Sequence, residues 1–358
     1  MRLFTKFYAL CALALCSILY SGWFLASQHY YRRVVLQGTA PKGGSDATAT
    51  VDRRLVVFGD SWSDTNAAPT QGSLWTDHLC SELSCEQDNL AQTAKSVRGN
   101  YIGSVVDNAE LSSMRTLFGL YRSPLADFKH QARQWLDAES AALLDYSDDE
   151  IRQRRNNTVF VVSFGVWDIW NLVGTNYEKA TASVDRSIAV LVEQLDLLSA
   201  GWDPSDFRVI LTLTPDVTFF PAFKSATKNK LSRHHKDVVR MIDYWNDRLR
   251  DAAVRWALGT VYLFDTNAFM MDLIRDWELS AVGVVEHGLG ENKDPGWENV
   301  DDPCVTTRNQ WVVMTDDRQC ENPAKYLFWN GMHLGPSAHR LMGTEVFQAI
   351  EEKWLRQK

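Results

Sequence analysis

Four short apolar runs, each ended by turn residues, form the clearest pattern along the chain. The first run begins at Arg54 and ends in Gly59-Asp60-Ser61, and the other three span residues 158–165, 207–215 and 260–265. Runs that are apolar at almost every position are typical of strands buried on both faces of a parallel sheet. Apolar residues also recur at helical spacing, over about 178–199, within 226–258 and from Pro336 onward. This alternation predicts an α/β domain with a mainly parallel sheet.

Two stretches interrupt the alternation. Residues 34–52 are small, polar and rich in Gly, Thr and Ala, which favours a flexible stalk. Residues 281–325 are rich in Gly, Asn, Asp and Pro and contain two cysteines, which favours a disulfide-stapled insertion. We therefore expect an N-terminal segment over residues 1–33, the stalk, and one domain over residues 53–358 that carries the insertion.

The N-terminal segment has the pattern of a membrane anchor. Residues 7–27 contain no charged side chain, and Arg2 and Lys6 precede them. As a helix this stretch would cross a hydrocarbon core of about 30 Å, and the preceding positive charges favour an N-terminus in the cytosol. We expect a signal anchor, and hence a single-pass type II membrane protein whose domain lies in the secretory lumen or at the cell surface. A cleaved signal peptide, which would make the protein secreted, and a buried core helix are the alternatives.

The cysteines fit an oxidising compartment. Four lie outside the apolar stretch, and their spacing pairs them as Cys80–Cys85 and Cys304–Cys320, although four cysteines allow three pairings. Zinc binding is the alternative use of four thiols, but no CxxC spacing is present. The sequon at Asn156 predicts a glycosylated side chain if the domain is lumenal, and an unused tripeptide is the alternative.

Charge and motifs narrow the function classes. The net charge is −8 and no basic stripe is present, so nucleic-acid binding is not expected. The chain has no Walker loop, no GxGxxG and no HExxH motif, so we expect neither a metal nor an organic cofactor. Nothing in the sequence indicates which oligomeric state the protein has.

Two residues have the positions of a nucleophile and a base. Ser61 follows the first predicted strand, and open α/β sheets bind ligands beyond the carboxyl ends of their strands. Backbone N–H groups at such a turn can stabilise an oxyanion. His333 lies on the loop that enters the last predicted helix, where a histidine can act as a general base. Trp62, next to the serine, is expected to form a pocket wall.

Together these elements resemble the GDSL-type SGNH hydrolases, and most closely their fungal secreted or membrane-anchored members. In that family the GDS serine is the nucleophile, and a DxxH motif near the C-terminus supplies an acid and a base. Residues 101–108 look like the second family block, in which the N–H of Gly103 joins the oxyanion hole, and residues 164–168 look like the third block, GxND. The resemblance covers roughly residues 54–350. It implies a three-layer α/β/α sandwich with a flavodoxin-like parallel sheet.

Two positions depart from the family motifs. The third block normally presents an asparagine to the oxyanion, and Trp167 stands there instead. We expect Trp167 to pack in the core. The alternatives are that its indole N–H reaches the oxyanion, or that Asn171 serves as a substitute donor. The DxxH motif has Asn330 in place of its acid, and an amide oxygen can orient His333 but adds no charge.

The Asn330 departure leaves three consequences open. The site could work as a Ser–His pair with Asn330 as orienting group, catalysis could be lost, or another carboxylate could approach in space. The candidate carboxylates all lie in the predicted insertion: Asp301, Asp302, Asp316 and Asp317.

The expected function is that of a serine ester hydrolase acting on acyl or acetyl esters of sugars or lipids. Ser61 would attack the ester carbonyl, and His333 would take the serine proton. A polysaccharide O-acyltransferase using the same serine is the second hypothesis. The third is a catalytically silent binding protein that keeps the fold, and Trp167 and Asn330 are the evidence for it.

Overall fold

The computed structural model describes residues 53–65, 71–95, 101–114, 125–202, 207–227, 234–283, 296–310 and 314–355. The predicted anchor and stalk, residues 1–33 and 34–52, lie outside these ranges. Within the ranges, no helix is both long and apolar enough to cross a bilayer. The described residues all belong to one unit, Val51–Lys358.

Five parallel strands form the central sheet, in the order β2-β1-β5-β6-β7. Their bounds are Arg53–Gly59 (β1), Cys85–Asn89 (β2), Thr158–Ser163 (β5), Arg208–Thr212 (β6) and Thr260–Phe264 (β7). When these five strands are renumbered in chain order, their order across the sheet is 2-1-3-4-5, as in flavodoxin. The fold class that the family resemblance implied is therefore confirmed.

Burial explains which strands the sequence pattern could predict. Every residue of β5 and β6 is buried, and so is the stretch of β1 from Leu55 to Gly59. These strands and β7 coincide with the four apolar runs. The fifth strand, β2, has the polar sequence CEQDN and, among the described strands, pairs with β1 alone, at the edge of the sheet. An edge strand with partly exposed side chains carries no apolar run, so its sequence gives no strand signal.

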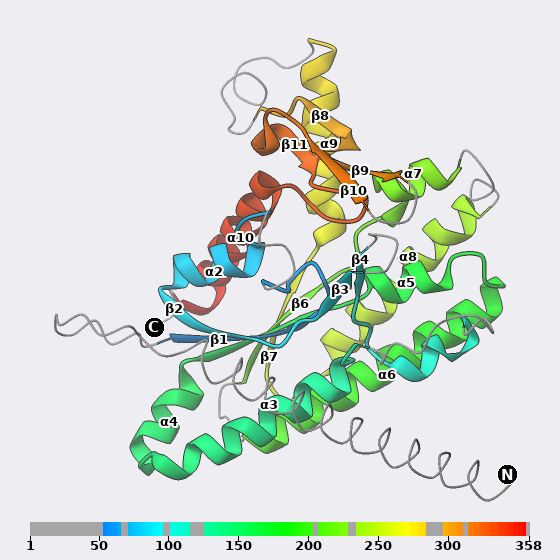
Figure 1. Ribbon diagram of the computed structural model, residues 1–358. Coiled ribbons are helices and arrows are strands. Elements are labelled where there is room, and N and C mark those ends of the chain that lie inside the picture. The colour runs from blue at the N-terminus through cyan, green and yellow to red at the C-terminus, as the bar shows by residue number, and fades with distance from the viewer. Residues whose placement is uncertain are drawn as a thin grey trace, which may run out of the picture. The chain divides into compact units, whose positions relative to one another are not determined.

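Helices cover both faces of the sheet. Figure 1 shows α2 and α10 on one face and α3 and α6 on the other, and α6 packs against both α3 and α8. The helices are α2 (Trp75–Leu83), α3 (Phe128–Ala142), α4 (Asp148–Asn156), α5 (Val166–Leu172), α6 (Tyr177–Trp202), α7 (Pro221–Thr227), α8 (His235–Arg255), α9 (Thr266–Ala281) and α10 (Pro336–Ile350). The predicted helix 178–199 is α6. The predicted stretch 226–258 contains α8, and the last helix starts at Pro336 as expected.

Aromatic side chains fill the core between the sheet and its helices. Phe160 on β5 stacks on Phe207 with 4.6 Å between ring centroids, and Trp135 on α3 lies 5.0 Å from Trp202 on α6. Trp245 on α8 is fully buried, as its helical spacing predicted. Aromatic pairs of this kind each contribute about 0.5–1.5 kcal/mol beyond the area they bury.

Short strands and two disulfides complete the fold. The segment expected to be an insertion, residues 281–325, contains β8 (Asn299–Pro303), β9 (Val305–Gln310) and β10 (Met314–Gln319), and β11 (Tyr326–Phe328) follows it directly. β9 and β10 form an antiparallel hairpin, and the Cys304–Cys320 disulfide closes its base. The Cys80–Cys85 disulfide joins α2 to β2. The four cysteines are thus paired as their spacing suggested, which leaves no thiol among them for zinc.

Candidate active site

The candidate nucleophile sits on a turn fixed by the central sheet. The Asp60 N–H donates to the Ser163 carbonyl at 3.1 Å, which continues the β1–β5 pairing by one residue. Gln131 holds the Gly59 peptide from the other side, because its Oε1 accepts the Gly59 N–H at 2.9 Å and its Nε2 donates to the Gly59 carbonyl at 3.0 Å. A Cβ at Gly59 would lie 2.9 Å from the Ser163 carbonyl, so this position has no room for a side chain. Ser61 lies two residues after Gly59, at the carboxyl end of β1.

A chain of hydrogen bonds runs through the Ser61 hydroxyl. Trp167 Nε1 donates to Ser61 Oγ at 2.8 Å, and Ser61 Oγ lies 2.8 Å from His333 Nε2. His333 Nδ1 lies 2.9 Å from Asn330 Oδ1. The Ser61, Trp167 and His333 side chains are all buried. The structure therefore brings the four main sequence-predicted residues together within hydrogen-bond distance.

Asn330 determines which nitrogen of His333 carries the proton. Its Oδ1 also accepts the N–H groups of Met332 at 2.9 Å and His333 at 3.0 Å, so this atom must be the amide oxygen. The His333 Nδ1 therefore donates, and Nε2 keeps a lone pair toward the serine. Ser61 can then donate its hydroxyl proton to Nε2, while Trp167 donates to the serine oxygen. This is the tautomer that a general base needs.

Burial sets the ionisation of His333. Removal from water lowers the pKa of His333 to about 4, because the imidazolium loses its hydration. Asn330 offers a dipole in place of the charge that a carboxylate would supply. The ring is thus neutral at physiological pH and able to accept a proton.

Several hydrogen bonds to backbone carbonyl groups fix the loop that carries His333. The Trp329 N–H donates to the His333 carbonyl at 2.9 Å. Two side chains from the segment after Ser61 hold the loop from outside, since Trp62 Nε1 donates to the Met332 carbonyl at 2.8 Å and Gln71 Nε2 to the Leu334 carbonyl at 2.6 Å. Trp62 was expected to wall a pocket, but it is only 3% exposed and acts as a support of this loop.

Gly103, the Trp167 indole and the Ser61 backbone nitrogen lie close together next to the Ser61 hydroxyl. A Cβ built on Gly103 would lie 2.3 Å from Trp167 Nε1 and 2.8 Å from the Ser61 backbone nitrogen. Only glycine can bring its backbone this close to both groups. In the described part of the chain, no backbone acceptor takes the Ser61 N–H. Trp167 is thus both buried, as expected, and a hydrogen-bond donor to the serine.

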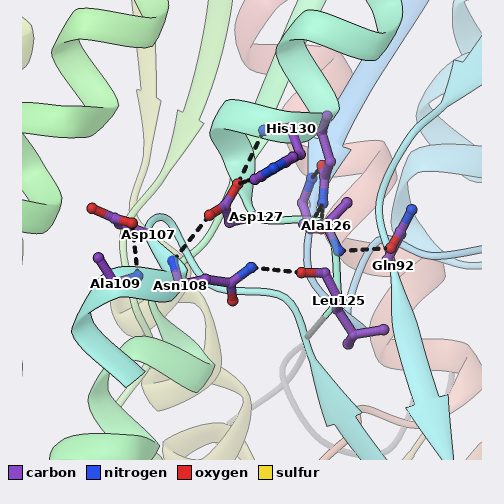
Figure 2. A network of polar contacts seen from close by, with 10 residues as sticks. Gln92, Asp107, Asn108, Ala109, Leu125, Ala126, Asp127 and His130 are labelled. Carbon is purple, nitrogen blue, oxygen red and sulfur yellow. Dashed lines mark hydrogen bonds and ion pairs between the residues drawn. The ribbon is translucent and has the colours of Figure 1, made fainter. Parts of the chain in front are cut away.

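The segment after Gly103 is held by buried carboxylates. Asp168 Oδ1 accepts the Val106 N–H at 3.0 Å, while its Oδ2 is buried without a hydrogen-bond partner in the described part of the chain. Desolvation raises the pKa of Asp168 to about 7. Figure 2 shows the next support, in which Asp127 at the start of α3 accepts the Asn108 N–H at 3.0 Å. Gln92 joins this network by accepting the Ala126 N–H at 2.9 Å.

Several predicted candidates lie away from this site. Asn171 donates its Nδ2 to the Trp167 carbonyl at 2.7 Å, so its amide is engaged within α5 and does not reach Ser61. Asp301 pairs with Lys224, and Asp302 contacts Asn299, so neither replaces Asn330 beside the histidine. The side chains of Asp316 and Asp317 lie outside the described residues.

Three supporting residues could not be found from the sequence: Trp62 as a loop support, Gln71 and Gln131. Their hydrogen-bond partners are far away along the chain, by 270 positions for Trp62, 263 for Gln71 and 72 for Gln131. No local pattern marks such pairs, although the closeness of Trp62 and Gln71 to the GDS turn could have drawn attention to them.

The parallel sheet, the serine after its first strand and the histidine before its last helix define the SGNH class of hydrolase. Residues 55–346 match the model of the family described as GDSL-like Lipase/Acylhydrolase. Since the match covers most of the chain, the protein belongs to this family of esterases and acylhydrolases.

Individual relatives are distant. One solved structure that matches is a carbohydrate acetylesterase from Sinorhizobium meliloti, with 10% identity, a TM-score of 0.37, and coverage of 84% of this chain and 100% of that one. Another is an aryl esterase from M. smegmatis, with 12% identity, a TM-score of 0.36, and coverage of 84% and 99%. At such low values, neither structure informs the substrate of this protein. A search of curated proteins gives no match.

Proposed function

We propose that the protein is a serine ester hydrolase in which Ser61 is the nucleophile, His333 the general base and Asn330 the group that orients His333. The observation that carries the proposal is the hydrogen-bond chain from Trp167 Nε1 through Ser61 Oγ to His333 Nε2, and from Nδ1 to Asn330 Oδ1. Chance rarely places a serine, a histidine and an orienting acceptor in this order.

The chemistry follows from the tautomer. Ser61 Oγ attacks the ester carbonyl carbon, and the hydroxyl proton passes to His333 Nε2. When the C–O bond to the leaving alcohol breaks, the imidazolium returns that proton to the alcohol oxygen and an acyl-serine remains. Water then attacks the acyl carbon, with Nε2 again taking and returning a proton. The N–H groups of Ser61 and Gly103 and the indole of Trp167 would hold the oxyanion in both steps.

The two departures from the family motifs each have a physical substitute. Trp167 Nε1 donates to Ser61 Oγ and lies close to Gly103, which supports the indole N–H as a substitute for the missing asparagine. Asn330 keeps the productive tautomer, because two backbone N–H groups fix its oxygen toward the imidazole. What Asn330 lacks is the negative charge that stabilises the imidazolium. We therefore expect a slower enzyme than one with aspartate at this position.

The test is turnover of p-nitrophenyl acetate and longer p-nitrophenyl esters by the purified domain, beside Ser61→Ala. We expect wild-type turnover that falls to background in Ser61→Ala, and labelling of Ser61 by a fluorophosphonate probe in the wild type alone. Equal rates in both proteins together with no labelling would reject the proposal. Such a result would favour the catalytically silent binding protein. The 3% exposure of Ser61 is consistent with that alternative.

Acyl transfer uses the same residues and is a separate outcome of the same assay. If sugar acceptors added to the reaction become acylated in preference to water, the protein is an O-acyltransferase. If acceptors leave the product unchanged, hydrolysis is the reaction. The serine and the histidine have the same roles in both cases.

We also propose that the domain acts in the secretory lumen or at the cell surface, anchored by residues 7–27 and joined to them by the stalk. Two disulfides are compatible with an oxidising compartment. Asn156 ends α4 with an exposed side chain, which a glycan could reach. A mobility shift after glycosidase treatment, absent in Asn156→Gln, together with carbonate-resistant membrane association, would support this location. Loss of either feature would remove the corresponding part of the proposal.

A further inference from the structure

The strand beside the Ser61 turn ends too early to pair with it. β2 ends at Asn89, which lies opposite Val57 of β1, so the Gly59 peptide lies beyond this pairing. The Gly59 N–H is nevertheless bonded, because Oε1 of the buried Gln131 on α3 accepts it at 2.9 Å. Gln131 Nε2 also donates to the Gly59 carbonyl at 3.0 Å. One side chain thus takes the place of a strand where β1 leads into Ser61.

Two glutamines and the residue before α3's N-cap close a ring of hydrogen bonds around this peptide. Gln131 Nε2 also donates to the Ala126 carbonyl at 2.9 Å, and the Ala126 N–H donates to Gln92 Oε1 at 2.9 Å, as Figure 2 shows for Gln92. The Gln92 N–H then donates to the Gly59 carbonyl at 3.2 Å. We call these four residues, Gly59, Gln92, Ala126 and Gln131, the glutamine ring. Both hydrogens and the oxygen of the Gln131 amide are engaged in it, so the orientation of this amide is fixed.

The glutamine ring continues into the segment that carries Gly103. Gln92 directly precedes a short antiparallel hairpin, and Gly103 ends it. The hairpin strands are β3 (Thr93–Lys95) and β4 (Tyr101–Gly103). The Ser104 N–H donates to the Gln92 carbonyl at 3.1 Å, which extends the pairing by one residue. The ring therefore joins Gly59, two residues before Ser61, to Ser104, the residue after Gly103.

Gly103 and Ser61 meet where these two segments converge. A Cβ built on Gly103 would lie 2.8 Å from the Ser61 backbone nitrogen. These residues supply the two backbone N–H groups of the proposed oxyanion site. Donors to an oxyanion act at about 2.7–3.1 Å, so the spacing of the two N–H groups has to be set before a substrate arrives.

We propose that the glutamine ring positions the backbone N–H groups of Ser61 and Gly103 relative to each other, with Gln131 as the main positioning residue. The inference rests on the proposed ester hydrolase function and adds residues that touch neither the substrate nor the reacting atoms. In the described part of the chain, every hydrogen bond of the Gln131 side chain goes to Gly59 or Ala126. Its amide thus acts on the ring alone.

A second connection should keep the protein folded when Gln131 is replaced. Asp64, three residues after Ser61, accepts the Thr93 N–H through Oδ2 at 2.8 Å. This bond joins the Ser61 segment to β3 without the Gln131 side chain. Loss of that side chain should therefore shift the two N–H groups without releasing the hairpin.

The experiment compares Gln131→Met with the wild type and with Gln194→Met. Methionine is similar to glutamine in length but has no N–H donor. Gln194 is the matched control, because it is equally buried, lies on α6, and neither polar atom of its amide has a hydrogen-bond partner in the described part of the chain. We expect Gln131→Met to lower kcat for p-nitrophenyl acetate about 10²-fold, as a misplacement of about 1 Å does in other enzymes. KM should change less than about twofold, because the lost interaction is made only in the transition states of the two steps. Gln194→Met should match the wild type.

A transition-state analogue tests the positioning directly. When a trifluoromethyl ketone reacts, the Ser61 oxygen bonds to the ketone carbon, the hydroxyl proton passes to His333 and the ketone oxygen becomes an oxyanion. Its Ki should rise in Gln131→Met about as much as kcat falls. A role in stability alone would lower the melting temperature but leave Ki unchanged well below it.

Gln92→Met is the second variant. It removes the acceptor of the Ala126 N–H, whereas the backbone bonds from Gln92 to Gly59 and Ser104 remain. We expect a smaller loss of kcat than in Gln131→Met. This variant decides the question if Gln131→Met does not fold, and wild-type values of kcat and Ki would then overturn the inference.

Amide hydrogen exchange separates failure of this inference from failure of the proposed function, because it needs no turnover. Peptides covering residues 55–64 and 101–108 should exchange faster in Gln131→Met than in the wild type or Gln194→Met. Unchanged exchange in both peptides overturns the inference, and so do unchanged kcat and Ki in an active enzyme. If the wild type neither cleaves esters nor reacts with the fluorophosphonate probe, the proposed function fails, and the exchange result alone decides whether the ring fixes these two segments.

Discussion

The turn that carries Ser61 and the loop that carries His333 meet at 2.8 Å but are held in different ways. β1 lies between β2 and β5 inside the sheet. Phe58, which directly precedes the Gly59-Asp60-Ser61 turn, is fully buried. The histidine loop follows β11, a strand of three residues that pairs with β8 in a two-stranded sheet separate from the main sheet. The nucleophile thus follows the buried end of a central strand, whereas the position of the base depends on a few hydrogen bonds to its loop, among them those from Trp62 and Gln71.

The insertion supplies part of that local support. The Cys304 N–H donates to the Phe328 carbonyl at 2.9 Å, and the Val305 N–H donates to the Trp329 carbonyl at 2.7 Å. The Cys304–Cys320 disulfide is therefore directly linked to the strand that leads into the histidine loop. Changes on this side should lower activity, and changes on the sheet side should lower stability without a loss of activity.

The largest effect is expected from Asn330→Ala. The substitution removes the acceptor of two backbone N–H groups and of His333 Nδ1. With neither tautomer nor ring position fixed, we expect kcat to fall about 10³-fold, roughly 4 kcal/mol of barrier. Esterase kinetics at saturating p-nitrophenyl acetate measure the loss, and chemical denaturation should give a much smaller change in the free energy of unfolding.

Asn330→Asp is the matched control for this prediction. Its carboxylate can accept the same three N–H groups and adds a charge beside the imidazole, which raises the pKa of His333. Turnover should be at least that of the wild type, with the acid limb of the pH profile moved to higher pH. A loss in Asn330→Asp as large as that in Asn330→Ala would show that the loop, rather than the acceptor, limits the reaction.

The second prediction compares the two disulfides, one on each side. The sequence separation is 16 for Cys304–Cys320 and 5 for Cys80–Cys85. Chain entropy then predicts destabilisation by about 3 and about 2 kcal/mol when each pair is replaced by serine. Well below the melting temperature, kcat should fall at least about tenfold without Cys304–Cys320, because the histidine loop is displaced. It should stay unchanged without Cys80–Cys85, and equal kcat in both variants would contradict the comparison.

The same contrast explains what could be read from the sequence. β1, β5 and β6 are buried on both faces, so their apolar runs mark them, and Ser61 and His333 could be located by their position after a strand and before a helix. The edge strand β2 has no such run. The roles of Trp62 and Gln71 depend on partners more than 260 positions away, which neither spacing nor composition encodes. Trp167 was expected in the core, and only the fold reveals that its buried indole also reaches Ser61.

The smallest effect is a difference in how the two sides respond to pH. Burial raises the pKa of Asp168 to about 7, above its unfolded value, so the ionised form opposes folding and stability is lost as pH rises toward 7. Burial lowers the pKa of His333 to about 4, below its unfolded value of 6.5, so stability is lost as pH falls below 6.5. The change in the free energy of unfolding caused by Asp168→Asn should therefore be more stabilising at pH 8 than at pH 5. The change caused by His333→Gln should be more stabilising at pH 5 than at pH 8. Each difference should be roughly 2 kcal/mol, because one pKa unit corresponds to about 1.4 kcal/mol. Urea denaturation of both variants and the wild type at the two pH values measures it, and the same sign in both variants would mean that burial does not control these two groups.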